Sequence, residues 1–265
     1  MNGAREPLPL SAVIIVCNEA DNLPECLQSV AFAQEILVVD SGSVDDSAAV
    51  AQALGARVLY HPWSGYGPQK RYAVSQARFD WVLCLDADER VSPELAESLR
   101  RVMGDGVPRF LAWSMPRCNR FMGRWLRHGF GYPDVKVRFF HRDHARWSDA
   151  PVHEKVETEG PAGELRGDLL HASAESLERY LEKHNRYTTQ QAELLLAAGD
   201  RGSAWRLVVN PIACFFKGYV LRLGFLDGLP GLVHTAIHCF TTLVKYAKVE
   251  QALQARKAEG ASKER

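Results

Sequence analysis

The sequence lacks the features that mark several common protein classes. Its six cysteines are scattered without a C-x-x-C pair, which argues against a disulfide framework or a zinc cluster and predicts reduced thiols in the cytosol. Residues 1–9 lack the apolar core of a signal peptide, and no uninterrupted apolar run reaches the roughly 18 residues of a simple spanning helix. The 32 basic and 32 acidic residues cancel, so the overall charge predicts no nucleic-acid partner.

The chain nevertheless has the size and composition of a large folded domain. Of its 265 residues, 46% are hydrophobic and 24% are charged, which predicts a globular domain with an appendage rather than a disordered chain. The charges are unevenly placed, because from Arg201 onward there are ten Lys and Arg residues against four Asp and Glu residues. The C-terminal end is therefore basic, and the preceding part carries the compensating acidic residues.

Short apolar runs alternate with helical patterns in the first part of the chain. The expected strands lie at residues 10–17, 35–39, 57–60 and 80–85. The expected helices lie at residues 23–30, 45–54, 69–77 and 93–103. Residues 65–68 are expected to form a loop before the third of these helices. Strands and helices that alternate at this spacing are typical of an α/β fold with a Rossmann-like, mostly parallel sheet flanked by helices.

The alternation loosens in the second part of the chain. We expect strands at residues 109–115 and 135–141, a loop at 117–133 between them, and a helix at 175–196. Two apolar stripes with the period of an α-helix then predict amphipathic helices at residues 205–223 and 229–247. The first of these helices is expected to start anew at Pro211, since proline suits the first helical turn.

Acidic residues follow three of the expected strands directly. Glu19 follows the first strand, Asp40 the second, and Asp86 and Asp88 the fourth. Because ligands of open α/β sheets bind beyond the carboxyl ends of the strands, these side chains should line one site. Asp40 can accept hydrogen bonds from a nucleobase or a ribose, and Asp86 and Asp88 can offer oxygens to Mg²⁺ or Mn²⁺. The alternative is that residues 86–89 only cap the following helix, but acidic residues at three strand ends favour a cation site.

Three further side chains near this edge have two interpretations each. Lys70 and Arg71 open an expected helix and can neutralise a phosphate, although a solvated helix face explains them equally well. His171 follows the apolar pair Leu169-Leu170 at the end of an expected strand. It can be a third metal ligand or a pyrophosphate contact, or a purely structural histidine.

Three segments resemble, in the right order, the signatures of glycosyltransferase family 2, which has the GT-A fold. They are VIIVCNEADN at residues 13–22, LVVDSGSVDDS at 37–47 and WVLCLDADE at 81–89, and the resemblance covers residues 10–190. Within that family, four features resemble the bacterial lipopolysaccharide core β-1,4-glucosyltransferases. These features are GYGPQKR at 65–71, VHEKV at 152–156, the strand ending at His171 and the basic, apolar C-terminal segment.

The resemblance implies a metal-dependent, inverting hexosyltransferase whose donor is a UDP-sugar, with UDP-glucose preferred. It implies that Glu19 and Asp40 contact the uridine and that Asp88 carries the Mg²⁺ or Mn²⁺. The implied acceptor is a heptose of the lipopolysaccharide inner core, and another nucleotide sugar or lipid-linked acceptor stays open. One departure concerns the base, because the Glu-Asp pair of many family members is absent from the second half and His153-Glu154 stands in that region.

An inverting transfer needs a base for the acceptor hydroxyl, because the proton must leave as the oxygen attacks. The base must lie away from the metal, which points to Glu154, flanked by two valines. On a strand, Glu154 would point to the same side as the valines, and His153 would face the other way. A surface Glu paired with Lys155 is the alternative, and Asp134 and Asp149 are the next candidates for the base.

The C-terminal stripes predict a peripheral protein on the inner, cytoplasmic face of the cytoplasmic membrane, because basic amphipathic helices bind anionic leaflets. Packing of the stripes on each other or on the catalytic domain is the alternative. The predicted organisation is an N-terminal tail at residues 1–9, a GT-A catalytic domain at 10–200, a membrane-associating helical segment at 201–256 and a frayed polar tail at 257–265.

Two other functions are weighed against glycosyl transfer. A sugar-nucleotide nucleotidylyltransferase would share the sheet and the metal, but it holds a triphosphate with a Gly-rich, basic loop after the first strand. Residues 18–21 are acidic there and would repel a triphosphate. A non-catalytic membrane-associated binding protein would explain the C-terminal helices and leave the acidic residues at three strand ends unexplained.

Overall fold

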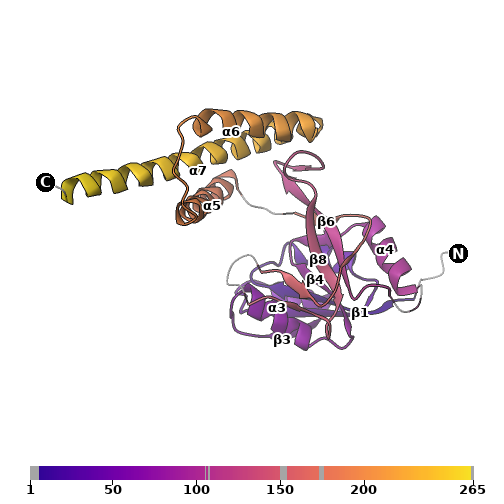
Figure 1. The fold of residues 1–265 in the computed structure, drawn as a ribbon. Coiled ribbons are helices and arrows are strands. Elements are labelled where there is room, and N and C mark those ends of the chain that lie inside the picture. The colour runs from indigo at the N-terminus through magenta and orange to yellow at the C-terminus, as the bar shows by residue number, and fades with distance from the viewer. Residues whose placement is uncertain (1–5, 105, 107, 150–153, 173–175, 264–265) are drawn as a thin grey trace. The chain divides into compact units, whose positions relative to one another are not determined.

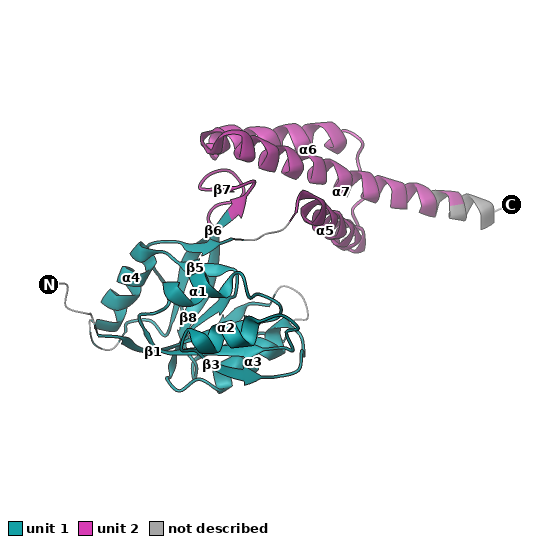
Figure 2. Ribbon diagram, turned by 180° about the vertical axis from the view of Figure 1, so that it is seen from behind, with its two compact units in different colours: residues 1–119, 134–172 teal, residues 120–133, 173–265 magenta. Residues whose placement is uncertain are grey.

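The chain folds into two compact units in the computed structural model, which describes residues 6–104, 106, 108–149, 154–172 and 176–263. The first unit comprises the chain up to Asn119 together with Asp134–Ala172. The second comprises Arg120–Pro133 and the chain from Ser173 onward, as Figure 2 shows in a second colour. The helix at residues 177–197 therefore groups with the C-terminal helices, and the division into a catalytic domain and a membrane-associating segment stays a prediction.

The first unit is built on a curled, mixed sheet (Figure 1). Its strand order is β3-β2-β1-β4-β8-β6-β12-β5, with β11 added beside β6, and β7 of the second unit pairs with the end of β6. Strands β1 to β4 are parallel, whereas β8 runs antiparallel to β4 and β6 antiparallel to β8. A separate two-stranded sheet joins β9 and β10. The strands are β1 (Leu8–Val16), β2 (Ala33–Asp40), β3 (Arg57–Tyr60), β4 (Trp81–Asp86), β5 (Glu89–Val91), β6 (Ala112–Phe121), β7 (Arg124–Trp125), β8 (Asp134–His141), β9 (Ala145–Trp147), β10 (Val156–Thr158), β11 (Gly163–Glu164) and β12 (Leu169–His171).

Helices cover both faces of the parallel part of this sheet. On one face, Leu10 and Ile14 of β1 share a core with residues of α1 (Leu23–Ser29), α2 (Ser47–Ala53) and α4 (Pro93–Gly104). On the other face, Val13 and Ile15 pack with residues of α3 (Tyr66–Ser75). A parallel strand covered on both sides needs an almost continuous apolar run, which is what β1 has. The predicted Rossmann-like sheet flanked by helices is thus confirmed.

Two predictions of loops are wrong. Helix α3 begins at Tyr66, inside the segment expected to be a loop. Gly65 ends the loop with a φ of 99°, and Pro68 lies in the first helical turn, where its missing N–H costs no hydrogen bond. The expected loop at residues 117–133 instead continues β6 to Phe121 and folds back as β7. Met122 and Gly123 both have positive φ, as a tight two-residue hairpin turn requires.

The second unit is helical. Its elements are α5 (Leu177–Ala197), α6 (Arg206–Phe215), a π-helix η1 (Phe216–Leu221), a 3₁₀-helix η2 (Gly224–Asp227) and α7 (Gly228–Lys263), and both α5 and α6 pack on α7. Two predictions are corrected here, because α6 begins before Pro211 rather than at it and α7 stays helical to Lys263. Buried Asp227 accepts the backbone N–H groups of Arg127 (3.0 Å) and His128 (2.8 Å) and so holds residues 120–133 against η2.

Candidate functional site

Asp40 lies at the carboxyl end of β2, opposite Val16 of the neighbouring strand β1. Its carboxylate accepts the backbone N–H groups of Gly42 (3.2 Å) and Ser43 (3.1 Å) and also the Ser43 hydroxyl. These bonds hold a turn in which Gly42 has a φ of 103°, a conformation that glycine adopts without strain. Asp40 therefore lies at the predicted strand end, and the turn that it organises forms part of that edge.

Glu19 lies in the loop after β1, and its carboxylate accepts the Asn22 side-chain amide at 2.7 Å. Burial raises the pKa of Glu19 and the Asn22 hydrogen bond opposes this rise. The negative charges of Asp88, Asp45 and Asp86 raise the pKa further. Carboxylates that follow three different strands thus repel one another at this edge, and a cation placed among them would relieve the repulsion.

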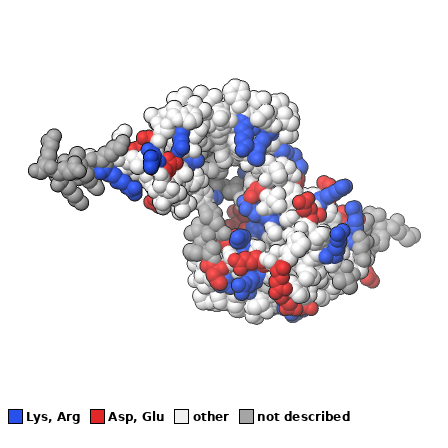
Figure 3. All heavy atoms as spheres, in the orientation of Figure 1, with Lys and Arg blue, Asp and Glu red and all other residues white. Residues whose placement is uncertain are grey.

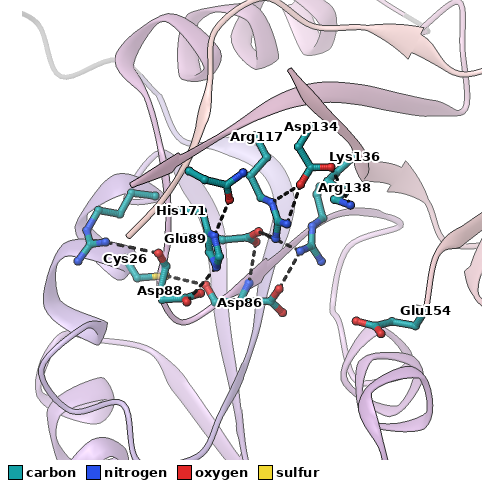
Figure 4. Close-up of polar contacts among 12 residues, drawn as sticks. Cys26, Asp86, Asp88, Glu89, Arg117, Asp134, Lys136, Arg138, Glu154 and His171 are labelled. Atoms are coloured by element: carbon teal, nitrogen blue, oxygen red, sulfur yellow. Dashed lines mark hydrogen bonds and ion pairs between the residues drawn. The ribbon is translucent and has the colours of Figure 1, made fainter. Parts of the chain in front are cut away.

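Asp86 and Asp88, at the end of β4 and just after it, have different partners (Figure 4). Asp86 forms ion pairs with Lys70 (2.9 Å) and Arg138 (2.7 Å). Burial raises the pKa of Asp86, but Arg138 and Lys70 outweigh burial and hold the pKa well below its usual range. Because the folded-state pKa is lowered, these ion pairs stabilise the fold at neutral pH and are lost only under strongly acidic conditions. Asp86 is a carboxylate that two protein cations already neutralise.

Asp88 instead faces His171 at the end of β12. The Nε2 atom of His171 lies 3.1 Å from Oδ2 of Asp88, and Nδ1 lies 2.8 Å from Oδ1 of Asn119 on β6. Because an amide oxygen only accepts, Nδ1 donates to Asn119, and Nε2 faces the Asp88 carboxylate. A carboxylate oxygen and an imidazole nitrogen at this distance can share a proton or bind one cation together. Metal-binding histidines are oriented by a second partner in the same way, so the pair fits a shared divalent cation.

The predicted set of three metal ligands is divided in the structure. Within the residue ranges described above, no three His, Cys, Asp or Glu side chains gather into a cluster that could hold a metal ion. The reason is that Asp86 turns to Lys70 and Arg138, which leaves Asp88 with His171. One or two protein ligands completed by substrate phosphates are typical of Mg²⁺-type sites, so the pair still fits that chemistry.

A row of alternating charges continues from Asp86 into the sheet (Figure 4). Glu89 of β5 is fully buried and accepts hydrogen bonds from Arg138 of β8 (2.9 Å) and Arg117 of β6 (3.4 Å). Arg117 also donates to Asp134 at 2.7 Å. Sequence reasoning missed Glu89, Arg117 and Arg138, and the one signal was an arginine inside the apolar run VKVRFFH at residues 135–141.

Replacing Arg138 by Met should lower the free energy of unfolding by about 3–5 kcal/mol, because removing one partner leaves a buried charge uncompensated. Fully buried Glu89 would keep the backbone N–H of Asp86 (3.0 Å), but its charge would be balanced only by the longer contact with Arg117. Urea unfolding followed by circular dichroism measures the change. The matched control is Arg146→Met, because Arg146 forms an exposed ion pair with Glu157 at 3.6 Å and should contribute at most about 1 kcal/mol. Equal losses in the two variants would contradict the role given to Arg138.

Lys70 is buried at the site rather than on a solvated helix face. Its side chain is 4% exposed, and its Nζ lies 2.9 Å from Asp86 and 3.0 Å from Glu154. The same Nζ lies 4.5 Å from the centre of the Trp147 ring, close enough for a cation–π contact. Lys70 therefore connects the predicted donor side of the site with the predicted base.

Arg71 contacts the loop after β9. It forms an ion pair with Asp149 at 2.5 Å and donates to the carbonyl oxygens of Trp147 (3.3 Å) and Ser148 (3.0 Å). These three bonds hold the loop beside α3, so Arg71 supports the segment that precedes Glu154. Its predicted contact with the donor stays a prediction.

Glu154 lies in the connection between β9 and β10 rather than on a strand. Strand β10 begins at Val156, opposite Trp147 of β9, so Glu154 precedes the strand and its predicted strand position is wrong. The expected orientation of His153 lies outside the described residues. Glu154 pairs with Lys70 instead of its neighbour Lys155, through Oε1 only. Its other carboxylate oxygen has no partner within the described parts of the chain, and Figure 4 shows the side chain well apart from Asp88 and His171.

Comparison with known proteins adds to this geometry. Residues 11–156 match the sequence profile of the family described as glycosyl transferase family 2. The chain is 32% identical to the lipopolysaccharide core biosynthesis glycosyltransferase LpsC of Rhizobium meliloti over 94% of this chain and 95% of that protein. It is also 32% identical to the uncharacterized glycosyltransferase RP128 of Rickettsia prowazekii, over 91% of this chain and 86% of that protein.

Among solved structures, similarity extends over part of the chain. A crystal structure of glucosyl-3-phosphoglycerate synthase from Mycobacterium tuberculosis, in complex with Mn²⁺, UDP and glucosyl-3-phosphoglycerate, is 23% identical. The superposition covers 43% of this chain and 44% of that one with a TM-score of 0.36. The crystal structure of another mycobacterial protein covers 70% of this chain and 74% of its own at 16% identity, with a TM-score of 0.46.

Proposed function

This chain belongs to glycosyltransferase family 2, and we propose that it transfers a hexose with inversion from a UDP-sugar, UDP-glucose in first place, to a heptose of the lipopolysaccharide inner core. It is a glycosyltransferase by family. Support for the acceptor class is the match with LpsC, which spans nearly the whole of both proteins. The observation that carries the proposal is the set of carboxylates after β1, β2 and β4, in which Asp86 is paired with Lys70 and Arg138 and Asp88 faces His171. Another nucleotide sugar or lipid-linked acceptor is the second candidate.

The donor diphosphate would meet its cation at Asp88 and His171. A bound divalent cation would neutralise the charge that develops on the leaving UDP. A histidine nitrogen in the ligand set favours Mn²⁺ over Mg²⁺, because imidazole suits transition metals better than hard cations. Glu19 and Asp40 would contact the uridine at the ends of β1 and β2. Asp86 would then face the donor as a carboxylate that Lys70 and Arg138 keep ionised and in place.

Glu154 would act on the acceptor. As the acceptor oxygen forms its bond to the anomeric carbon, the bond from that carbon to the UDP oxygen breaks, and the hydroxyl proton passes to Glu154. Inversion follows because the two oxygens lie on opposite faces of the sugar ring. The contact with Lys70 holds one carboxylate oxygen and leaves the other for the proton. Lys70 would also hold Asp86, so that one side chain keeps donor and acceptor groups at a constant separation.

A panel of UDP-hexoses offered to the full-length protein tests the function. With Mn²⁺ present, the protein should slowly hydrolyse one donor without an acceptor and should transfer its sugar to heptose-containing inner-core saccharide; chelator should abolish both reactions. Release of pyrophosphate from UTP and a sugar 1-phosphate would instead show a nucleotidylyltransferase. Binding of UDP without turnover of any donor would show a non-catalytic binding protein.

The proposed acceptor also indicates where in the cell the transfer takes place. Inner-core saccharide is attached to lipid, so we propose that the protein works as a peripheral protein at the inner face of the cytoplasmic membrane. The basic C-terminal sequence supports attachment to an anionic leaflet.

A further inference from the structure

The helices of the second unit expose apolar side chains on one side. On α6 and η1 these residues recur every three or four positions, which places them on one face of a helix. They are Val208, Val209, Ile212, Phe216 and Val220. In Figure 3 the upper edge of this unit, over α6, is uncharged, and Lys and Arg side chains gather below it. The face is too continuous to be a set of scattered surface residues.

Helix α7 continues the same pattern. Leu229 is 65% exposed and Phe240 is 58% exposed, and Leu232 and Leu243 lie on the same side at helical spacing. Helix α6 packs along α7, and each of the two helices leaves one apolar stripe exposed. A helix of a water-soluble protein would turn such a stripe toward the core.

The polar side of α7 is turned inward instead. Lys248 donates to Asn185 (2.7 Å), Thr188 (2.9 Å) and Thr189 (2.7 Å) of α5. His234 and Thr235 are buried. A cavity of about 170 Å³ lies between α5 and α7, and His, Thr, Gln, Tyr and Lys side chains line it. Over the first half of α7 the buried side therefore mixes polar His234 and Thr235 with apolar Ile237, whereas the exposed side is apolar.

Length and composition add a second, independent observation. No single helix among the described residues is long and apolar enough to cross a membrane. The segments Arg206–Leu221 and Gly224–Arg256 reach that composition only together, and they are bent by 71° at the break between them. Two cations, Lys217 and Arg222, are exposed on the hairpin close to this break. A hairpin that entered a bilayer tip first would carry both cations into hydrocarbon, which is unfavourable.

We propose that α6, η1 and the first half of α7 lie flat in the headgroup region of an anionic phospholipid leaflet, with their shared apolar face embedded and Lys217 and Arg222 on lipid phosphates. The apolar stripes explain the embedding and the two cations explain the preference for anionic lipid. Lys248 of α7 stays on the protein, where Asn185 and Thr188 of α5 accept its hydrogen bonds. The contact involves these helices at the depth of the lipid headgroups. It does not depend on the reaction that the first unit performs.

Sedimentation of the full-length protein with vesicles tests the contact. The protein should pellet with phosphatidylcholine vesicles containing phosphatidylglycerol, and part of the binding should persist at high salt because the apolar face contributes. The double variant Phe216→Asp/Phe240→Asp should bind at least about tenfold more weakly, since a charge on each helix must be dehydrated. The matched control is Leu194→Asp, because Leu194 is equally apolar, 70% exposed, and on α5 outside the face. The variant Lys217→Gln/Arg222→Gln should lose the preference for anionic vesicles.

Trp205 reports the depth of insertion, because it is 60% exposed at the start of α6. Its fluorescence, taken as the difference from Trp205→Phe, should be quenched by lipids brominated near the headgroup and not by lipids brominated near the chain end. Quenching at the chain end, equal pelleting of wild type and the double Asp variant, or a dimer in solution that this variant dissociates would each overturn the proposal. Hydrolysis of the donor without vesicles should be unchanged in all variants, which separates a failure of this contact from a failure of the proposed reaction.

Discussion

Glu154→Gln should bind UDP as the wild type does and lose transfer by at least about a hundredfold, because a positioned general base contributes 10²–10⁴-fold. Glutamine keeps the shape of the side chain, and its amide oxygen can still accept a hydrogen bond from Lys70, now 3.0 Å from Oε1. Only the ability to take the proton from the acceptor hydroxyl is removed. Initial rates at saturating donor and acceptor, with UDP affinity from calorimetry, separate the two effects.

The matched control for this prediction is Glu157→Gln on β10. Glu157 is a half-exposed carboxylate three residues away whose ion pair with Arg146 spans 3.6 Å, so its neutralisation should leave turnover unchanged. Near wild-type turnover in Glu154→Gln would move the role to Asp134 or Asp149. Both are weaker candidates: burial raises the pKa of Asp134, but Arg117 and Lys136 outweigh burial and lower it, which weakens the base. Asp149 is exposed and held by Arg71 at 2.5 Å.

Asp88→Asn should lower metal-dependent transfer by at least about a hundredfold, because charge stabilisation of the leaving group is worth several kcal/mol. The readout independent of activity is Mn²⁺ binding in the presence of UDP, followed by electron paramagnetic resonance. Asn119→Ala should weaken Mn²⁺ binding by about 10–100-fold without removing a metal ligand, since Asn119 orients His171.

Asp80→Asn is the control for Asp88→Asn. Asp80 is an exposed carboxylate before β4 and pairs with Arg142 at 2.8 Å, so its replacement should leave Mn²⁺ binding and transfer at wild-type values. Full activity of Asp88→Asn in the presence of chelator would show that the aspartate has no metal role. Unchanged Mn²⁺ binding in both Asp88→Asn and His171→Gln would place the cation elsewhere.

The parallel half of the fold was predictable because its signals are local. Each buried strand is one apolar run, and the acidic residue that follows it can be read directly beside it, as for Asp40 after β2. The ends of parallel strands meet at one edge, so residues distant in sequence could be placed together by topology alone. This reasoning brought Glu19, Asp86 and Asp88 to the same edge, where the structure finds their charges interacting.

The antiparallel half was not predictable in the same way. Arg138 and Arg117 reach Glu89 only because β8 and β6 return beside β4, and no local pattern states which strands become neighbours. The link between Lys70 and Glu154 joins residues 84 positions apart and depends on a loop rather than on a repeating element. Alternation placed Glu154 on a strand because two valines flank it, whereas the pairing of β9 with β10 begins only at Val156.

The clamp between Asp227 and residues 127–128 has a consequence for synthesis on the ribosome. The backbone N–H of His128 is bonded by a carboxylate made 99 residues later. At a translation rate of about 5–20 residues per second, Asp227 is made about 5–20 s after the hairpin β6–β7 and its following loop. Until then the second unit cannot close, although the strands of the first unit up to β12 have already emerged. A nascent chain that stops before Asp227 would therefore present residues 120–133 to chaperones and proteases with two backbone donors lacking the carboxylate that they bond in the finished protein.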